Sequence, residues 1–179
     1  MIGCIEPVVE PMTSRPPRID ASGPIGFEDG ERGSDRPAVG IRRVLLATDL
    51  SSASERAAME AIRLASDARA QLVVLSVIDP GRLRLPGGLF LRRVDEERAR
   101  VESATQVLVA RARATGVRAT FLVWEGDPAE AILAASVSEN VDLIVIGSHG
   151  RGPLGRFVLG STSASVSQHA RCRVLVVPA

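Results

Sequence analysis

Lysine is absent from this chain of 179 residues, in which all 22 basic side chains are arginine. A chain without lysine has neither the P-loop lysine that contacts nucleotide phosphates nor the strand lysine of a protein kinase. It also cannot form a Schiff base through a lysine amine. These enzyme classes are therefore excluded, whatever the cause of the arginine bias, for which genomic base composition is the simplest explanation.

Cysteine and histidine are scarce, with two residues of each. Cys4 and Cys172 lie near opposite ends without a CxxC pair, and His149 and His169 lack metal-ligand spacing. We therefore expect neither a zinc site nor a disulfide framework. Cys172 precedes an apolar segment, so we interpret it as a small packing residue in a reducing compartment.

Aromatic residues make up only 3% of the chain, and the formal net charge is +1. This combination disfavours nucleic-acid binding, which relies on basic patches and stacking platforms. No apolar run approaches the roughly 20 residues of a membrane span. The N-terminal stretch MIGCIEPVVEPM also lacks the basic start and uninterrupted apolar segment of a secretory signal. We expect a cytoplasmic protein with no nucleic-acid partner and no membrane partner.

The first 40 residues differ in composition from the rest. They hold six prolines, six glycines and seven acidic residues against four arginines, with few bulky apolar residues. Such a segment cannot bury enough apolar surface to offset the entropy of folding. We predict a disordered N-terminal tail over residues 1–40 and one folded domain over residues 41–179.

From Ile41 onward, apolar runs alternate with amphipathic segments. The pattern predicts strands over residues 41–48, 71–78, 117–125, 141–148 and 173–178, and helices within 49–70, 91–115, 128–140 and 160–170. Ser52 and Glu55 form a candidate capping box, Asp127 and Pro128 start the third helix, and Gly116 ends the second. Strands alternating with helices predict an α/β fold, a three-layer α/β/α sandwich with a Rossmann-like, five-stranded parallel sheet.

In such sheets, ligands bind beyond the carboxyl ends of the strands. The stretch IVIGSHGRGPLGRFVLGST, residues 144–162, leaves the fourth strand there and carries five glycines and two arginines. Gly147 and Gly150 leave room for another molecule beside the backbone, and Gly160 exposes backbone N–H groups at a helix start. Hydroxyl groups stand at the same helix start, and Arg151 and Arg156 are suited to close over phosphates. The pattern indicates a triphosphate cradle without a Walker lysine.

Three motifs together resemble the universal stress protein family: ATDLS, SVIDP and the spacing Gly147-x2-Gly150-x9-Gly160-Ser161. The resemblance runs from about Ile41 to Pro178. It implies the adenine nucleotide alpha hydrolase-like fold and membership of the ATP-binding subgroup, with ATP bound together with Mg2+. It also implies a homodimer formed through the last strand, Arg173 to Val177, which would otherwise be an exposed edge.

The resemblance implies that adenine and ribose lie near Asp49 and Val77, and the phosphates near Gly150, Gly160, Ser161 and Thr162. Asp49 has an alternative role at the entry to a helix, but we favour ligand contact because Ser52 supplies the capping box. The full set of expected nucleotide-binding residues is Ala47, Thr48, Asp49, Val77, Ile146, Gly147, His149, Gly150, Arg151, Gly160, Ser161, Thr162 and Ser163.

We expect an ATP-binding regulatory domain of the stress response that acts as a dimer. One alternative is a weak ATPase or an autophosphorylating enzyme, but the sequence shows no evident general base, and no residue is assigned as catalytic or metal-ligating. His149 has no carboxylate at an evident position to orient it, so it is interpreted as a loop residue near the ligand. The other alternative is a binding module for AMP or a cyclic nucleotide.

Overall fold

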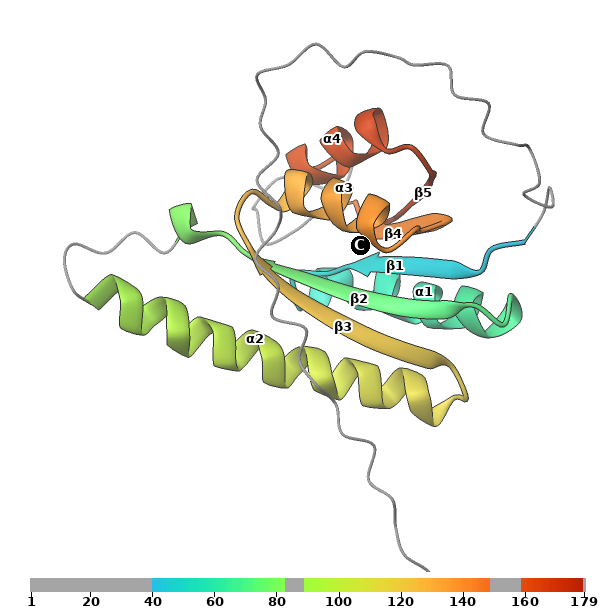
Figure 1. Cartoon of the computed structure of the whole chain (residues 1–179), viewed down its shortest axis with the longest axis horizontal. Coiled ribbons are helices and arrows are strands. Elements are labelled where there is room, and N and C mark those ends of the chain that lie inside the picture. The colour runs from blue at the N-terminus through green and yellow to red at the C-terminus, as the bar shows by residue number, and fades with distance from the viewer. Residues whose placement is uncertain (1–39, 83–88, 149–158, 179) are drawn as a thin grey trace, which may run out of the picture.

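The computed structural model describes residues 40–82, 89–148 and 159–178, and Figure 1 shows their arrangement. The strands are β1 (Arg43–Ala47), β2 (Gln71–Ile78), β3 (Arg118–Glu125), β4 (Leu143–Gly147) and β5 (Arg173–Val177). The helices are α1 (Glu55–Asp67), α2 (Leu89–Ala114), α3 (Pro128–Ser138) and α4 (Ser161–His169), with short 3-10 helices η1 (Ser52–Ser54) and η2 (Pro80–Arg82). The predicted α/β fold is confirmed, and each predicted strand and helix is present.

All five strands are parallel, in the spatial order β3-β2-β1-β4-β5. The chain builds the sheet outward from β1 to β3, and then returns to place β4 on the other side of β1. The strand order therefore reverses between β1 and β4. In open parallel sheets, the crevice at this switch point is the usual ligand site.

Helices cover both faces of the sheet, as Figure 1 shows, with α1 and α2 on one face and α3 and α4 on the other. The central strand β1 serves both cores because its side chains alternate. Val44 and Leu46 pack with α1 and α2, whereas Leu45 and Ala47 pack with α3 and α4. Each of these four side chains is at most 6% exposed. This burial on both faces explains the uninterrupted apolar run that predicted the strand.

The predicted ends of α2 and α3 are confirmed. The Asp127 carboxylate accepts hydrogen bonds from the backbone N–H groups of Ala129 (2.9 Å) and Glu130 (3.0 Å), and Pro128 follows as the first helical residue. Gly116, just beyond α2, has a φ of +83°, a left-handed conformation that glycine adopts without steric cost.

The predicted capping box at the start of α1 is wrong. Ser52 lies inside the 3-10 helix η1, and α1 begins three residues later at Glu55. Neither Ser51 nor Ser54, the residues at the two helix starts, makes a side-chain capping bond. Serine hydroxyls and Asx turns compete with regular capping, and here they fold the segment before α1 differently.

The tail predicted for residues 1–40 lies outside the described residues, except for Gly40 at its end. Across the described ranges, every helix is too short or too polar to cross a membrane.

Candidate functional site

The carboxyl ends of the strands, here called the carboxyl edge, bring together residues from distant parts of the sequence. Ala47 of β1 is the direct neighbour of Ile146 of β4, and Gly147 follows Ile146 at the end of the strand. On the other side of β1, the N–H of Thr48 donates to the carbonyl oxygen of Leu75 in β2 (3.0 Å). Half-buried Val77 lies two residues further along β2. The predicted residues of the first, second and fourth strands therefore meet at the switch point.

Thr48 uses its hydroxyl group to shape the loop between β1 and α1. The Ser54 hydroxyl donates to the carbonyl oxygen of Ser51 (2.8 Å), so its proton is committed. In the 2.9 Å contact between the two hydroxyls, Thr48 is therefore the donor and Ser54 the acceptor. Thr48 Oγ1 also accepts the N–H of Leu50 (3.0 Å). Since Thr48 is only 7% exposed, its side chain holds the loop in shape.

Asp49 follows Thr48 and forms an Asx turn. One carboxylate oxygen, Oδ1, accepts both the backbone N–H (3.1 Å) and the hydroxyl (2.7 Å) of Ser51. Asp49 therefore has the Asx-turn role that was the alternative to ligand contact, and a capping box at Ser52 no longer argues for that contact. These two bonds also fix the orientation of a half-buried carboxylate at the switch point.

Two buried hydroxyls that the sequence analysis missed lie next to this loop. Ser76 of β2 is 2% exposed and donates to the carbonyl oxygen of Thr48 (3.1 Å). Thr105 of α2 is fully buried and donates to the carbonyl oxygen of Val101 (2.7 Å). A signal for Ser76 was present, because a single serine interrupts the otherwise apolar strand QLVVLSVI. A buried hydroxyl needs a partner, and here that partner is the end of β1.

The two ends of the glycine-rich segment are held together. Ser148, directly after β4, donates its N–H to the carbonyl oxygen of Val177 in β5 (2.7 Å). Its own carbonyl oxygen accepts the N–H of Gly160 (2.8 Å). The Ser163 hydroxyl contacts the same Ser148 oxygen (3.1 Å) and the Gly160 oxygen (2.9 Å). Ser163 is 2% exposed, so its side chain joins α4 to the end of β4.

The start of α4 offers backbone donors to an anion. The first N–H groups of a helix have no acceptor within the helix, and Gly160, at the N-cap position, has no side chain to supply one. Ser161 is exposed and Thr162 half-buried, so both hydroxyls stand at the surface beside these donors. The helix dipole favours negative charge at the same point. This helix start therefore fits a phosphate group.

Three of the predicted binding residues, His149, Gly150 and Arg151, lie outside the described residues, as does Arg156. The structure brings the other predicted residues to the carboxyl edge. They fall into two groups, the strand ends with Asp49 and the start of α4.

Cys172 lies at the opposite end of the sheet, just before β5, and is half-buried. Burial raises the pKa of its thiol, and the nearby Asp142 carboxylate raises this pKa further. A raised pKa keeps the thiol protonated at neutral pH and lowers its reactivity. This agrees with the interpretation of Cys172 as a packing residue.

A parallel α/β sheet with helices on both faces and a switch point in its strand order defines the class of Rossmann-like α/β proteins, in which ligands usually bind at the carboxyl edge. The comparison with known proteins gives the family. A model of the universal stress protein family matches residues 40–178, and the chain belongs to this family.

Individual relatives agree with this assignment. The Thermus aquaticus universal stress protein in QAH/OAS sulfhydrylase 3'region is 38% identical over 138 residues, which cover 76% of this chain and 98% of the relative. The structure of UspA from Lactobacillus plantarum aligns with a TM-score of 0.71 and 26% identity, covering 78% of this chain and 99% of that chain. A universal stress protein in complex with cAMP aligns with a TM-score of 0.61 and 24% identity, covering 78% and 98%, and this likeness concerns the fold.

Proposed function

We propose that this protein is an ATP-binding regulatory member of the universal stress protein family. The observation that carries the proposal is the start of α4, where the N-cap residue Gly160 leaves backbone N–H groups open next to the end of β4. This anion-receptive helix start stands beside the switch point, where Asp49 presents an oriented carboxylate. A nucleotide combines the two chemistries that these groups suit, a polar nucleoside and an anionic phosphate chain.

In this proposal, adenine and ribose occupy the strand ends, with Asp49 and Val77 in contact and Ala47, Ile146 and Gly147 forming the floor. The phosphates lie over the start of α4, against Gly160, Ser161 and Thr162, and His149, Gly150 and Arg151 complete the site from the glycine-rich segment. Thr48 and Ser163 do not contact the ligand in this proposal, because their buried hydroxyls already bond within the protein. They hold the loop after β1 and the start of α4 in place. Mg2+ would accompany the triphosphate as its counter-ion.

The choice among adenine nucleotides depends on the outer phosphates. A structural neighbour holds cAMP, so this fold accommodates an adenine nucleotide with a single phosphate. In our proposal, the additional donors at Ser161, Thr162 and Arg151 favour the triphosphate over AMP or cyclic AMP. The carboxylates that directly follow β1 and β2 both accept hydrogen bonds from neighbouring residues. Asp49 bonds to Ser51, and Asp79 accepts the N–H of Gly81 (2.9 Å), which favours binding over hydrolysis.

We further propose a homodimer formed through β5. This strand is the outer neighbour of β4 at one edge of the sheet. Its residues Val174, Leu175, Val176 and Val177 are each only half-buried. A short apolar edge strand with open backbone groups is a natural pairing surface for a second copy.

The substitution Gly160→Asp tests the nucleotide site. Gly160 has φ −61° and ψ 152°, which any residue adopts, and aspartate is a favoured N-cap. The new carboxylate would itself accept the first N–H groups of α4 and repel phosphate. We expect the free energy of unfolding to change by less than about 1 kcal/mol. ATP binding, measured by calorimetric titration with Mg2+, should weaken at least about tenfold, or about 1.4 kcal/mol.

Two controls sharpen this test. Gly160→Ala adds a Cβ without a capping group and should weaken ATP binding less than Gly160→Asp does. Titration of the unsubstituted protein with AMP and cyclic AMP measures what the outer phosphates contribute. Unchanged ATP affinity in a folded Gly160→Asp protein would contradict the proposed site, and equal affinity for ATP and AMP would contradict the triphosphate preference.

A further inference from the structure

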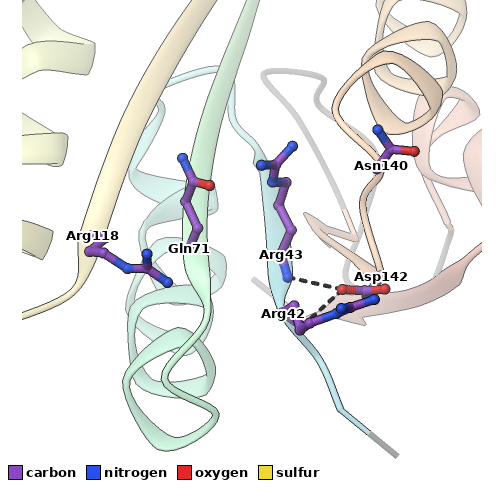
Figure 2. Close-up of a pocket in the computed structure, with 6 residues that line it drawn as sticks. All are labelled: Arg42, Arg43, Gln71, Arg118, Asn140 and Asp142. Carbon is purple, nitrogen blue, oxygen red and sulfur yellow. Dashed lines mark hydrogen bonds between the residues drawn. The ribbon is translucent and has the colours of Figure 1, made fainter. Parts of the chain in front are cut away.

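A polar hollow lies at the amino ends of the strands, here called the amino edge, at the opposite end of the sheet from the proposed nucleotide site. Its volume is about 380 Å³, within the range of small-molecule clefts, which starts near roughly 300 Å³. Figure 2 shows the six residues that line it. They are Arg42, Arg43, Gln71, Arg118, Asn140 and Asp142. Every one of these side chains is polar, so the hollow suits a hydrophilic ligand.

The strand register explains why arginines gather there. Arg43 of β1 pairs with Gln71 of β2, which in turn pairs with Arg118 of β3. Neighbouring strands are about 4.8 Å apart, so the two arginine backbones stand about 10 Å apart with Gln71 between them. In Figure 2 the Arg118 side chain extends from β3 toward β2. A group seated over Gln71 therefore lies within reach of guanidinium groups from both sides.

The carboxylates near the hollow are engaged in holding the fold. Asp142 Oδ2 accepts the backbone N–H groups of Arg42 (2.8 Å) and Arg43 (3.0 Å), which fastens β1 to the start of β4. The Nη1 of Arg43 donates to the backbone carbonyl oxygen of Glu139, just after α3. The same nitrogen lies 3.5 Å from the side-chain carboxylate of Glu139. Arg43 has five N–H donors, so its Nε and Nη2 groups remain for a ligand.

Positive charge exceeds negative charge at this edge. Arg118 is exposed, and no carboxylate in the described ranges forms an ion pair with it. Three arginines line the hollow against the two carboxylates of Asp142 and Glu139, which leaves a net charge of +1. Arg69, two residues before β2, and Arg173, the first residue of β5, are two further exposed arginines at the amino edge of the sheet.

We propose that this hollow binds a phosphate monoester with a polar, sugar-like body. The phosphate lies over Gln71 between Arg118 and Arg43, and the polar body contacts Asn140 and Arg42 at the rim. Guanidinium forks that approach from two sides match a tetrahedral group with oxygens in several directions better than a planar carboxylate. The site is separate from the proposed nucleotide site and does not depend on it, since the length of the strands lies between them.

The test is a titration of the full-length, 15N-labelled protein with glucose 6-phosphate, followed by NMR. We expect saturable shifts of the backbone amides of Gln71, Arg118 and Asn140. Glucose, and sodium chloride at matched ionic strength, should produce no such shifts. A saturating nucleotide should leave the glucose 6-phosphate affinity unchanged, because the two sites lie at opposite ends of the sheet.

Two substitutions and a control decide the assignment. Arg118→Gln removes one of the two guanidinium groups and should weaken binding by about tenfold. Gln71→Glu, which is nearly isosteric, places a negative charge at the phosphate seat and should abolish binding. Arg63→Gln removes an exposed arginine that pairs with Glu60 and Asp67 on α1, and should change nothing.

Three results would overturn the proposal. The first is amide shifts that do not saturate with glucose 6-phosphate and instead rise linearly with ionic strength. The second is a loss of affinity in Arg63→Gln as large as that in Arg118→Gln. The third is displacement of glucose 6-phosphate by nucleotide. Each would assign the binding to bulk charge or to the carboxyl edge.

Discussion

Thr48 illustrates how a buried hydroxyl can shape a binding site from within the protein. Its position at the end of β1 made it a candidate ligand contact in the sequence. In the structure its proton goes to Ser54 and its oxygen receives the N–H of Leu50, a residue held at a φ of +60°. The hydroxyl therefore stabilises an otherwise unfavourable backbone turn next to Asp49.

The substitution Thr48→Val removes this hydroxyl while keeping the shape of the side chain. The N–H of Leu50 loses its acceptor and Ser54 loses its donor, so we expect a loss of about 1–3 kcal/mol in the free energy of unfolding. Urea denaturation measures this loss. Thr48→Ser keeps the hydroxyl and should cost clearly less. If serine and valine destabilise the protein equally, packing of the methyl group, and not hydrogen bonding, is what Thr48 contributes.

At the scale of elements, the starts of α1 and α3 look alike in sequence but differ in structure. Both have a polar residue that precedes a glutamate by three positions, Ser52 before Glu55 and Asp127 before Glu130. Asp127 caps α3 with two hydrogen bonds, whereas Ser52 lies exposed within a 3-10 turn. The difference arises because Asp49, Ser51 and Ser54 already bond among themselves and with Thr48 before α1 begins.

Alanine substitutions separate the two helix starts. Asp127→Ala should lower the free energy of unfolding by about 1 kcal/mol, the usual cost of losing an N-cap. Ser52→Ala should change it by less than about 0.5 kcal/mol, as for a surface position. Chemical denaturation of both variants under the same conditions provides the comparison. A loss of similar size in Ser52→Ala would mean that the capping box forms after all.

The helices and strands could be predicted from the sequence because their signals are local. Apolar runs predicted β2 with its exact ends, and Asp127 and Gly116 predicted two helix ends. Gly160 likewise predicted the start of α4, whereas the binding of a ligand there stays a prediction. The loop before α1 could not be predicted, because several hydroxyls compete for the same backbone groups there. The hollow at the amino edge was also missed, because it depends on pairing among three strands that are far apart in the sequence.

At the scale of the whole molecule, β5 is the strand through which we propose that two copies pair. In a parallel sheet, alternate residues of a strand direct both backbone groups to the same side. The carbonyl oxygen of Val177 bonds to Ser148 beside β4, so the backbone groups of its neighbour Val176 point away from the sheet. The N–H of Val176 is therefore available to a partner strand.

The substitution Val176→Pro removes this outward N–H without removing a bond to β4. Proline is tolerated on edge strands, so the monomer should remain folded. We expect the dissociation constant of the dimer to rise at least about tenfold, measured by sedimentation velocity over a concentration series. Val176→Thr keeps both the N–H and the shape, and should still dimerise. A Val176→Pro protein that remains fully dimeric would place the interface away from β5.

The central position of β1 also has a consequence for how the protein is made. One half of the proposed nucleotide site follows Ala47, and the other follows Gly147, one hundred residues later in the chain. A ribosome adds about 5–20 residues per second, so the second half emerges about 5–20 s after the first. During that interval the side of β1 that will receive β4 has no strand to pair with, and it is an exposed edge of the kind that invites aggregation. The switch point is therefore closed late in synthesis, with only β5 still to be added to the sheet, and the ability to bind nucleotide would be gained only when nearly the whole chain has been translated.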